Sequence, residues 1–203
     1  MDYLQYIVGQ IHTVVAATVD DEGLPVTCAI DIMDADEKGL YFLTAKGKNF
    51  YHRLNATKYI AFTGIKGNST MSSVAVSVGG KVREMGSGRL ADLFAKNPYM
   101  AEIYPTAESR KALTVFCIYQ GRGQWFDLSQ KPIIRADFTF GDLTQEKNGY
   151  FINEKCVGCG RCLDLCPQQC IVRGTPFRIE QEHCLHCGNC REVCPAKAVD
   201  KRG

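Results

Sequence analysis

The sequence lacks the features of a membrane or secreted protein. No uninterrupted apolar run approaches the roughly 20 residues that a membrane-spanning helix requires. The start, from Met1 to Leu4, has no basic segment leading into an apolar stretch, which is the pattern of a secretory signal. We therefore expect a cytoplasmic protein without a membrane span.

An excess of positive charge is also missing. The chain has 24 Lys and Arg residues against 22 Asp and Glu residues, and within residues 1–149 the two signs cancel. Proteins that bind nucleic acid present clustered basic residues, because contacts with the phosphate backbone supply much of their affinity. The charge pattern therefore predicts no nucleic-acid partner.

Cysteine, by contrast, is abundant, with 11 in 203 residues. In a chain without a secretory signal this favours metal ligation in a reducing compartment over a disulfide scaffold. Eight of the cysteines form two runs of the same spacing, each ending in Cys-Pro. The first run is Cys156, Cys159, Cys162 and Cys166, and the second is Cys184, Cys187, Cys190 and Cys194. This spacing is the bacterial pattern for iron–sulfur ligation, and its two copies predict two [4Fe–4S] clusters.

The two runs are expected to exchange their last cysteines. Three cysteines spaced three residues apart can hold three corners of one iron–sulfur cube in a tight loop. The fourth begins a helical segment that leads away, so it should reach the other cube. The predicted ligand sets are Cys156, Cys159, Cys162 and Cys194 for cluster 1, and Cys184, Cys187, Cys190 and Cys166 for cluster 2.

Other interpretations of the cysteines are weaker. Zinc also binds CxxC pairs, but a zinc site would not need the third cysteine or the trailing Cys-Pro. A dithiol redox motif is disfavoured because neither CxxC follows a βαβ pattern. His183 and His186 could replace cysteines as in a two-iron Rieske centre, although eight cysteines are already in register. Cys28 and Cys117 are expected to be small buried residues of apolar strands, and Cys170 is expected to pack against the clusters. None of the three is expected to be a ligand.

The region ahead of the cysteine runs alternates mainly between strand patterns and turns. Helical periods are predicted over 2–11, 47–56 and 89–104, the last interrupted at Pro98. Strands are predicted over 12–20, 24–33, 39–45, 59–65 and 70–85, with turns at 20–23 and 34–39. Residues 112–119 and 123–128 are predicted to form a closing hairpin. Many short strands with few helices favour a small antiparallel barrel.

Three segments of this region carry a family resemblance. GLPVTCAIDIM, GLYFLTAKGKNFYHRL and KYIAFTG, at 23–33, 39–54 and 58–64, resemble the flavin-binding split barrel of the pyridoxamine 5′-phosphate oxidase family. The similarity covers roughly residues 1–140. It implies FMN bound at the interface of a homodimer.

The resemblance also implies particular FMN contacts. In the family, a strand ending in an aromatic-x-x-Thr pattern and a following basic turn bind the phosphate, and a nearby strand lies along the isoalloxazine ring. The matching phosphate positions are Thr44, Lys46, Lys48 and Asn49, and Thr27 and Ala29 lie on the ring strand. Independently, a hydroxyl, a positive charge and an amide ahead of a predicted helix suit a phosphate dianion. The alternative is that the two lysines only form a solvated turn.

The chain also departs from the family pattern. The Arg-Leu-x-Pro ending that binds pyridoxal phosphate in the family is absent, and the cysteine-rich segment follows the barrel instead. The resemblance therefore supports the cofactor rather than pyridoxamine oxidation. Trp125, the single tryptophan, is expected in the core, and the alternative is that it covers a flavin from the neighbouring subunit.

The predicted fold is mainly β with α+β character, an antiparallel split β-barrel over 1–141 and a small ferredoxin-like domain over 142–203. The second part resembles two-cluster bacterial ferredoxins over about residues 150–200. Together they predict an FMN- and iron–sulfur-dependent oxidoreductase that exchanges electrons with a redox protein or an unidentified small molecule. The alternatives are a non-enzymatic electron carrier, or a barrel that binds haem or a deazaflavin. No catalytic acid or base can be named from the sequence.

Overall fold

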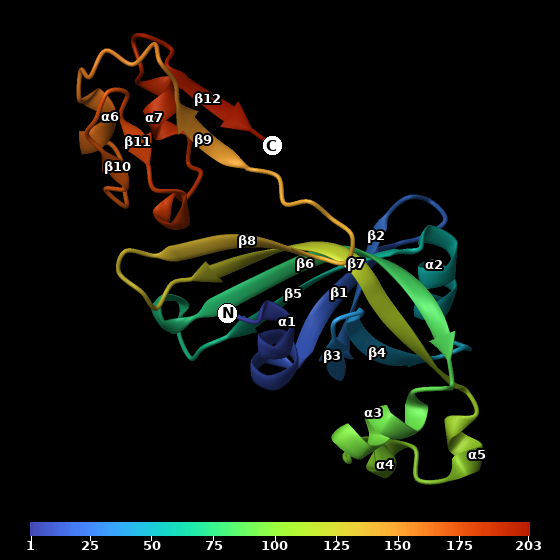
Figure 1. Cartoon of the computed structure of the whole chain (residues 1–203). Coiled ribbons are helices and arrows are strands. Elements are labelled where there is room, and N and C mark those ends of the chain that lie inside the picture. The colour runs from blue at the N-terminus through green and yellow to red at the C-terminus, as the bar shows by residue number, and fades with distance from the viewer. The chain divides into compact units, whose positions relative to one another are not determined.

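An eight-stranded sheet forms the first part of the chain. The computed structural model describes residues 1–203, and the sheet order is β2-β1-β5-β6-β7-β4-β3, with β8 also paired to β7 (Figure 1). The strands are β1 Thr13–Val19, β2 Pro25–Asp31, β3 Asp34–Asp36, β4 Gly39–Ala45, β5 Tyr59–Lys66, β6 Val74–Gly86, β7 Leu113–Asp127 and β8 Ile134–Phe140. The pairs β1–β2, β1–β5, β3–β4 and β4–β7 are antiparallel. This confirms the predicted mainly-β split barrel.

Strand alternation and a tight turn set the register of the first hairpin. β1 buries every second residue, and β2 pairs with it from Thr13 opposite Asp31 to Val19 opposite Pro25. In the connecting turn the Asp20 carboxylate accepts hydrogen bonds from the backbone N–H groups of Glu22 and Leu24 at 3.0 and 2.8 Å. The predicted hairpin is therefore present, with its turn fixed by an aspartate cap.

Short helices close the ends of the sheet. They are α1 Tyr3–Tyr6, a π-helical turn Ile7–Ile11, α2 Asn49–Thr57, and the group α3 Leu90–Lys96, α4 Met100–Ile103 and α5 Ala107–Arg110 between β6 and β7 (Figure 1). The predicted helices at 2–11, 47–56 and 89–104 are thus confirmed, including the break at Pro98. Phe42 of β4 stacks on Phe116 of β7 with ring centroids 5.7 Å apart, and Phe50 of α2 lies 6.1 Å from Phe42. These rings form the centre of the barrel core.

The predicted closing hairpin at 112–119 and 123–128 is wrong. Both segments belong to one continuous strand, β7, and its hairpin partner is β8. Gly121 lies in the predicted turn and Gly123 directly after it, but both are strand residues that make room for aromatic rings of β8. A Cβ at Gly121 would lie 2.6 Å from the Phe140 ring, and one at Gly123 would overlap the Phe138 ring. Glycine here marks a close packing contact in a strand, not a break.

A second difference lies at residues 34–39, where the sequence predicts only a turn. Asp34–Asp36 form the short strand β3, which pairs with β4. Asp34 is 5% exposed and accepts hydrogen bonds from Arg89 at 2.8 Å and Lys96 at 2.6 Å. These cations compensate the buried charge. An acidic segment with the composition of a surface turn is therefore part of the sheet.

The cysteine-rich part is built from very short elements. They are β9 Gly149–Ile152, α6 Arg161–Asp164, β10 Ile171–Val172, β11 Arg178–Ile179, a 3-10 turn Gln181–His183, α7 Asn189–Glu192 and β12 Val199–Arg202. β9 pairs with β12 and β10 with β11, both antiparallel. The small core contains Ile171, Phe177, Ile179 and Val199 together with buried cysteines. This part has a ferredoxin-like arrangement, as predicted.

The chain divides into two compact units. One comprises Met1–Asn68, Ala75–Gln124 and Asp137–Leu143, and the other comprises Ser69–Val74, Trp125–Ala136 and Thr144–Gly203. We call them the barrel unit and the cluster unit. The loop between β7 and β8 belongs to the cluster unit, and the 3-10 turn Thr70–Ser72 does too. The boundary between 141 and 142 stays a prediction. None of the helices combines the length and apolar character needed to cross a bilayer.

Candidate cofactor sites

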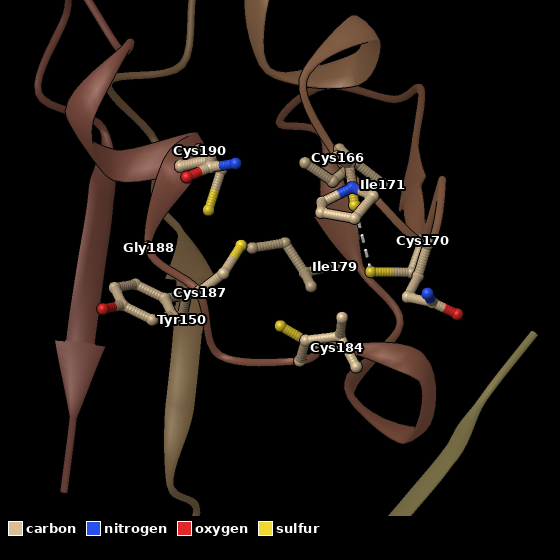
Figure 2. Close-up of a pocket in the computed structure, with 13 residues that line it drawn as sticks. Tyr150, Cys166, Cys170, Ile171, Ile179, Cys184, Cys187, Gly188 and Cys190 are labelled. Carbon is tan, nitrogen blue, oxygen red and sulfur yellow. Dashed lines mark hydrogen bonds between the residues drawn. The ribbon is translucent and has the colours of Figure 1, made fainter. Parts of the chain in front are cut away.

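The cluster unit contains a hollow surrounded by four of the predicted ligands. Cys166, Cys184, Cys187 and Cys190 line about 340 Å³ of empty space, which we call the second cysteine site. Figure 2 shows the sulfurs of the last three pointing toward one another. Ile171 and Ile179 add apolar walls, and Tyr150 closes another side (Figure 2). The hollow is therefore lined mainly by sulfur and apolar groups, together with Gln168 and Asn189.

A matching hollow contains the other four cysteines. Cys156, Cys159, Cys162 and Cys194 line about 350 Å³ of empty space, which we call the first cysteine site. Each hollow takes three cysteines from one run and the fourth from the other run. This is the grouping that the exchanged ligand sets require, while ligation of iron by these residues remains a prediction.

Local backbone geometry explains the exchange. Gly160 and Gly188 adopt φ values of +82° and +84° just before α6 and α7, a left-handed conformation that glycine allows without strain. Each glycine lies between the second and third cysteines of its run and starts a single helical turn that carries the third, Cys162 or Cys190. That turn carries Cys166 or Cys194 away from its own run.

The placing of four cysteines around each hollow is the arrangement that an iron–sulfur cube needs. In a cube each thiolate binds a different iron, so the sulfurs surround a volume rather than meet at a point. Burial raises the pKa of the Cys190 thiol to about 11, and the neighbouring Cys184 adds to the rise. Ligation of a metal by Cys190 would therefore displace a proton from its thiol.

The remaining cysteines and histidines have different surroundings. Cys117 is fully buried, as expected, and Cys170 is 3% exposed beside the second cysteine site. Cys28 is a correction, because it is only partly buried and lines a hollow of the barrel unit. His183 and His186 line neither cysteine site, and His183 Nδ1 lies 3.0 Å from the backbone oxygen of Ile133.

The barrel unit contains a larger hollow with about 920 Å³ of empty space. We call it the barrel hollow. Its lining comprises Thr13, Cys28, Ala29, Ile30, Asp31, Met33, Leu43, Thr44, Ala45, Lys48, Phe50, Met100, Ile103 and Tyr104. Three of the predicted FMN contacts, Ala29, Thr44 and Lys48, are therefore brought together. The other three, Thr27, Lys46 and Asn49, are exposed and do not line the hollow.

One corner of the barrel hollow is suited to an anion. Lys48 is the N-cap residue of the nine-residue helix α2, whose start has no side-chain cap, so its first N–H groups remain available. Arg53, one turn further along α2, donates a hydrogen bond from Nε to Thr18 at 2.8 Å. Burial raises the pKa of Cys28, while the charges of Arg53 and Lys48 oppose that rise. The Cys28 thiol therefore lies in a cationic environment.

The sequence did not indicate that α4 contributes to the lining of this hollow. Met100 and Ile103 of α4, with the following Tyr104, lie on its lining, although they are more than 50 residues from Lys48. The interruption at Pro98 indicated only that a second helix follows. The part of the sheet against which α4 packs is decided by tertiary contacts, which the local sequence does not reveal.

A polar network at the edge of the hollow was also not predicted. Asp31 accepts hydrogen bonds from the hydroxyls of Thr13 and Tyr99, both at 2.6 Å. His12 Nε2 lies 3.0 Å from the Tyr99 hydroxyl. Burial alone would raise the pKa of Asp31, but these two hydrogen bonds and the nearby His12 outweigh it and lower the pKa. Asp31 is therefore held as a carboxylate beside the hollow.

The fold and the sites define a class of protein, a split-barrel domain with an anion-suited hollow joined to a domain with two four-cysteine sites. Family comparisons agree with this description. The model "Pyridoxamine 5'-phosphate oxidase" matches residues 2–122, and the model "4Fe-4S dicluster domain" matches residues 149–195. The chain therefore belongs to the pyridoxamine 5′-phosphate oxidase family and carries a 4Fe–4S dicluster domain, which confirms both resemblances.

Solved structures with the same barrel are distant in sequence. A NimC/NimA family protein from Clostridium acetobutylicum is 14% identical, covers 68% of this chain and 90% of its own, and has a TM-score of 0.54. A protein related to general stress protein 26, also from Clostridium acetobutylicum, is 15% identical, and the match covers 68% of this chain and 91% of that protein with a TM-score of 0.51. A heme binding protein from Mycobacterium smegmatis is 14% identical, and the match covers 67% of this chain and 56% of that protein with a TM-score of 0.52. These similarities establish the fold alone. Among curated proteins, no sequence matches the chain.

Proposed function

We propose that this protein is an FMN- and iron–sulfur-dependent oxidoreductase in which electrons pass between two [4Fe–4S] clusters and a flavin in the barrel hollow. The observation that carries the proposal is the presence in one chain of two four-cysteine sites and a hollow with a cationic corner. FMN supplies a centre that exchanges two electrons singly or as a hydride, and each cluster exchanges one. Such a pairing converts between one-electron and two-electron chemistry.

The barrel residues have distinct tasks in this proposal. Lys48 neutralises phosphate charge, the Thr44 hydroxyl donates to a phosphate oxygen, and the uncapped start of α2 adds N–H donors. Ala29 has a small side chain on the hollow wall, so a flat ring can approach the backbone of β2. Met100 and Tyr104 add apolar and aromatic surface to the lining. Lys46 and Asn49 do not line the hollow, so in this proposal they contribute to FMN binding only at long range.

The cysteine sites need little beyond their thiolates. Eight thiolates in two sets of four hold the clusters after giving up their protons. The apolar side chains between them, including Ile171 and Phe177, keep water away from the sulfurs. Eleven free cysteines also suit the reducing cytoplasm in which we place the protein.

A homodimer is part of the same proposal. Val15 on β1 and Tyr59 and Ile65 on the adjacent β5 are 57%, 50% and 65% exposed, on the face of the sheet turned away from the core. An apolar sheet face of this kind is typical of a protein interface. A second copy of this chain would cover it. Light scattering should give twice the chain mass for the wild type and a smaller mass for Ile65→Asp; a monomeric wild type would contradict the dimer.

The decisive experiment is anaerobic purification with an absorption spectrum and quantitation of iron, sulfide and flavin. We expect about eight irons and eight sulfides per chain, with flavin bands near ~450 nm over the broad cluster absorption. A sharp Soret band would show that the barrel binds haem instead, and a deazaflavin would be identified by mass after extraction. Reduction through the clusters without conversion of any organic acceptor would favour the non-enzymatic electron carrier.

A further inference from the structure

The second cysteine site contains a fifth sulfur. Cys170 lies four residues after Cys166, and its Sγ is 3.5 Å from the Cys166 Sγ (Figure 2). Its side chain is 3% exposed and lines the same hollow as the four predicted ligands. A cube held by four cysteines has no ligand position left for it. Cys170 therefore needs a different explanation.

The internal repeat supplies a comparison. The residue four positions after Cys194, the fourth cysteine of the other run, is the fully buried Ala198. Its backbone N–H donates to the Cys194 Sγ at 3.3 Å. Both fourth cysteines thus have a neighbour four residues later within hydrogen-bonding distance. In the first cysteine site this neighbour is a backbone amide, and in the second it is a thiol.

We propose that the Cys170 thiol donates a hydrogen bond to the Cys166 sulfur and thereby raises the reduction potential of the cluster at the second cysteine site. The inference rests on the proposed function, since it requires a cluster there. Reduction adds a negative charge that spreads over the ligand sulfurs, so a donor on one of them favours the reduced form. The apolar surroundings, including Ile171 and Ile179, strengthen the interaction by lowering the local dielectric.

Cys170 is therefore a positioning residue, and it makes the two sites unequal. Cys170→Ala removes the donor and should shift the one-electron equilibrium about tenfold toward the oxidised cluster, which corresponds to a potential about 59 mV lower. Cys170→Ser keeps a hydroxyl donor and should restore most of the shift. Ala198→Cys introduces a thiol at the equivalent position of the first site and should raise the potential of that cluster.

The test separates the two clusters by ligand variants at equivalent positions. Cys159→Ala leaves only the cluster of the second site, and Cys187→Ala leaves only that of the first. In each background, redox titration followed by electron paramagnetic resonance measures the reduction potential of the remaining cluster, once with Cys170 present and once with Cys170→Ala added. Iron and sulfide are quantified first in every variant. Cys117→Ala, which removes a buried thiol of the barrel unit, is the control for loss of a cysteine elsewhere.

We expect the potential to fall in the Cys159→Ala background and to stay constant in the Cys187→Ala background. No shift in the first background, or equal shifts in both, would overturn the proposal. Loss of iron on Cys170→Ala would also overturn it, because Cys170 would then be needed to hold the cluster. If single-cluster variants do not fold, one of the two potentials should still move in the intact protein. A parent protein without iron would contradict the proposed function itself.

Discussion

The barrel unit has a hydrophobic core without a cysteine cluster, whereas the small core of the cluster unit combines apolar side chains with three buried cysteines. In the barrel unit Phe42 and Phe116 are fully buried between strands of seven and 15 residues. In the cluster unit the helices have four residues each, two strands have two, and Cys170, Cys184 and Cys190 belong to the buried core. Helices this short are not stable by themselves. From this comparison we expect the barrel unit to fold without a cofactor and the cluster unit to depend on iron.

Removing iron should break this comparison most visibly. After anaerobic chelation and reduction of the thiols, we expect the cluster unit to lose its ordered structure, because the bonds to iron supply much of its folding free energy. Hydrogen exchange followed by mass spectrometry should then show loss of protection over 149–202 and retained protection over 13–45. Persistent protection of β9 and β12 in the iron-free protein would mean that the cluster unit folds unaided.

A second experiment lowers the stability of the barrel unit and leaves the cluster unit unchanged. Phe116→Ala removes a buried ring stacked on Phe42, and losses of this kind typically cost about 3–5 kcal/mol of stability. Denaturant unfolding followed by near-ultraviolet dichroism should show the loss, while the iron content of the native protein stays unchanged. Leu24→Ala, at a 56% exposed turn position, is the matched control with an effect within about 0.5 kcal/mol. Iron loss in native Phe116→Ala would show that the units are not independent.

A pair of lysine variants sharpens the assignment of the barrel hollow. Lys48 lines the hollow and Lys46 does not, although both lie in the same basic turn. Loss of a charged phosphate contact should weaken FMN binding roughly tenfold to a hundredfold for Lys48→Ala. The Lys46→Ala variant should bind FMN almost as well as the wild type. Fluorescence titration of flavin-free protein measures both, and equal effects of the two variants would contradict a specific phosphate site at Lys48.

The smallest expected effect concerns acid stability of the barrel unit. Burial by itself would raise the pKa of Asp31. The hydrogen bonds from Thr13 and Tyr99 and the nearby His12 outweigh burial and lower this pKa below its ordinary value of 3.8. A lowered pKa in the folded state stabilises the protein above that ordinary value, and this contribution is lost as the pH falls through the folded-state pKa. Because Asp31 is partly exposed, we expect no more than about 1 kcal/mol.

Asp31→Asn should therefore lower barrel stability at pH 6 and have little effect at the acid end of the curve. Urea unfolding between pH 6 and the lowest pH at which the barrel remains folded measures the difference. Asp21→Asn, in the exposed turn after β1, serves as the control and should leave the curve unchanged. A stability difference between the wild type and the Asp31→Asn variant that is independent of pH would contradict the electrostatic origin.

Local signals predicted most of the barrel. Strand-type composition and alternation located β1, β2, β4 and β5, and helical spacing located α2. In β1 and β5 alternate residues are buried, as such a pattern predicts. The pattern failed where side chains distant in the sequence decide the structure. Gly121 and Gly123 are understood only with the rings of Phe140 and Phe138, and strand β3 only with Arg89.

The candidate sites were predictable to different degrees. The cysteine spacing alone anticipated which four thiols surround each hollow, because the loops are short and the geometry is local. The barrel hollow also depends on α4, whose residues reach it only after β5, β6 and α3 have been placed. Lys46 and Lys48 looked equivalent in the sequence, and their difference arises because α2 begins directly after Lys48.

The exchange of cysteines between the two runs has a consequence for how the protein is made. The second cysteine site is complete once Cys190 has been synthesised, and the first, although it begins at Cys156, must wait for Cys194. Since chains emerge from the ribosome in sequence order, the two sites become complete within four residues of each other. A chain that stalls between the two runs would carry four exposed thiols and no complete site, which makes it a target for oxidation or for the wrong metal.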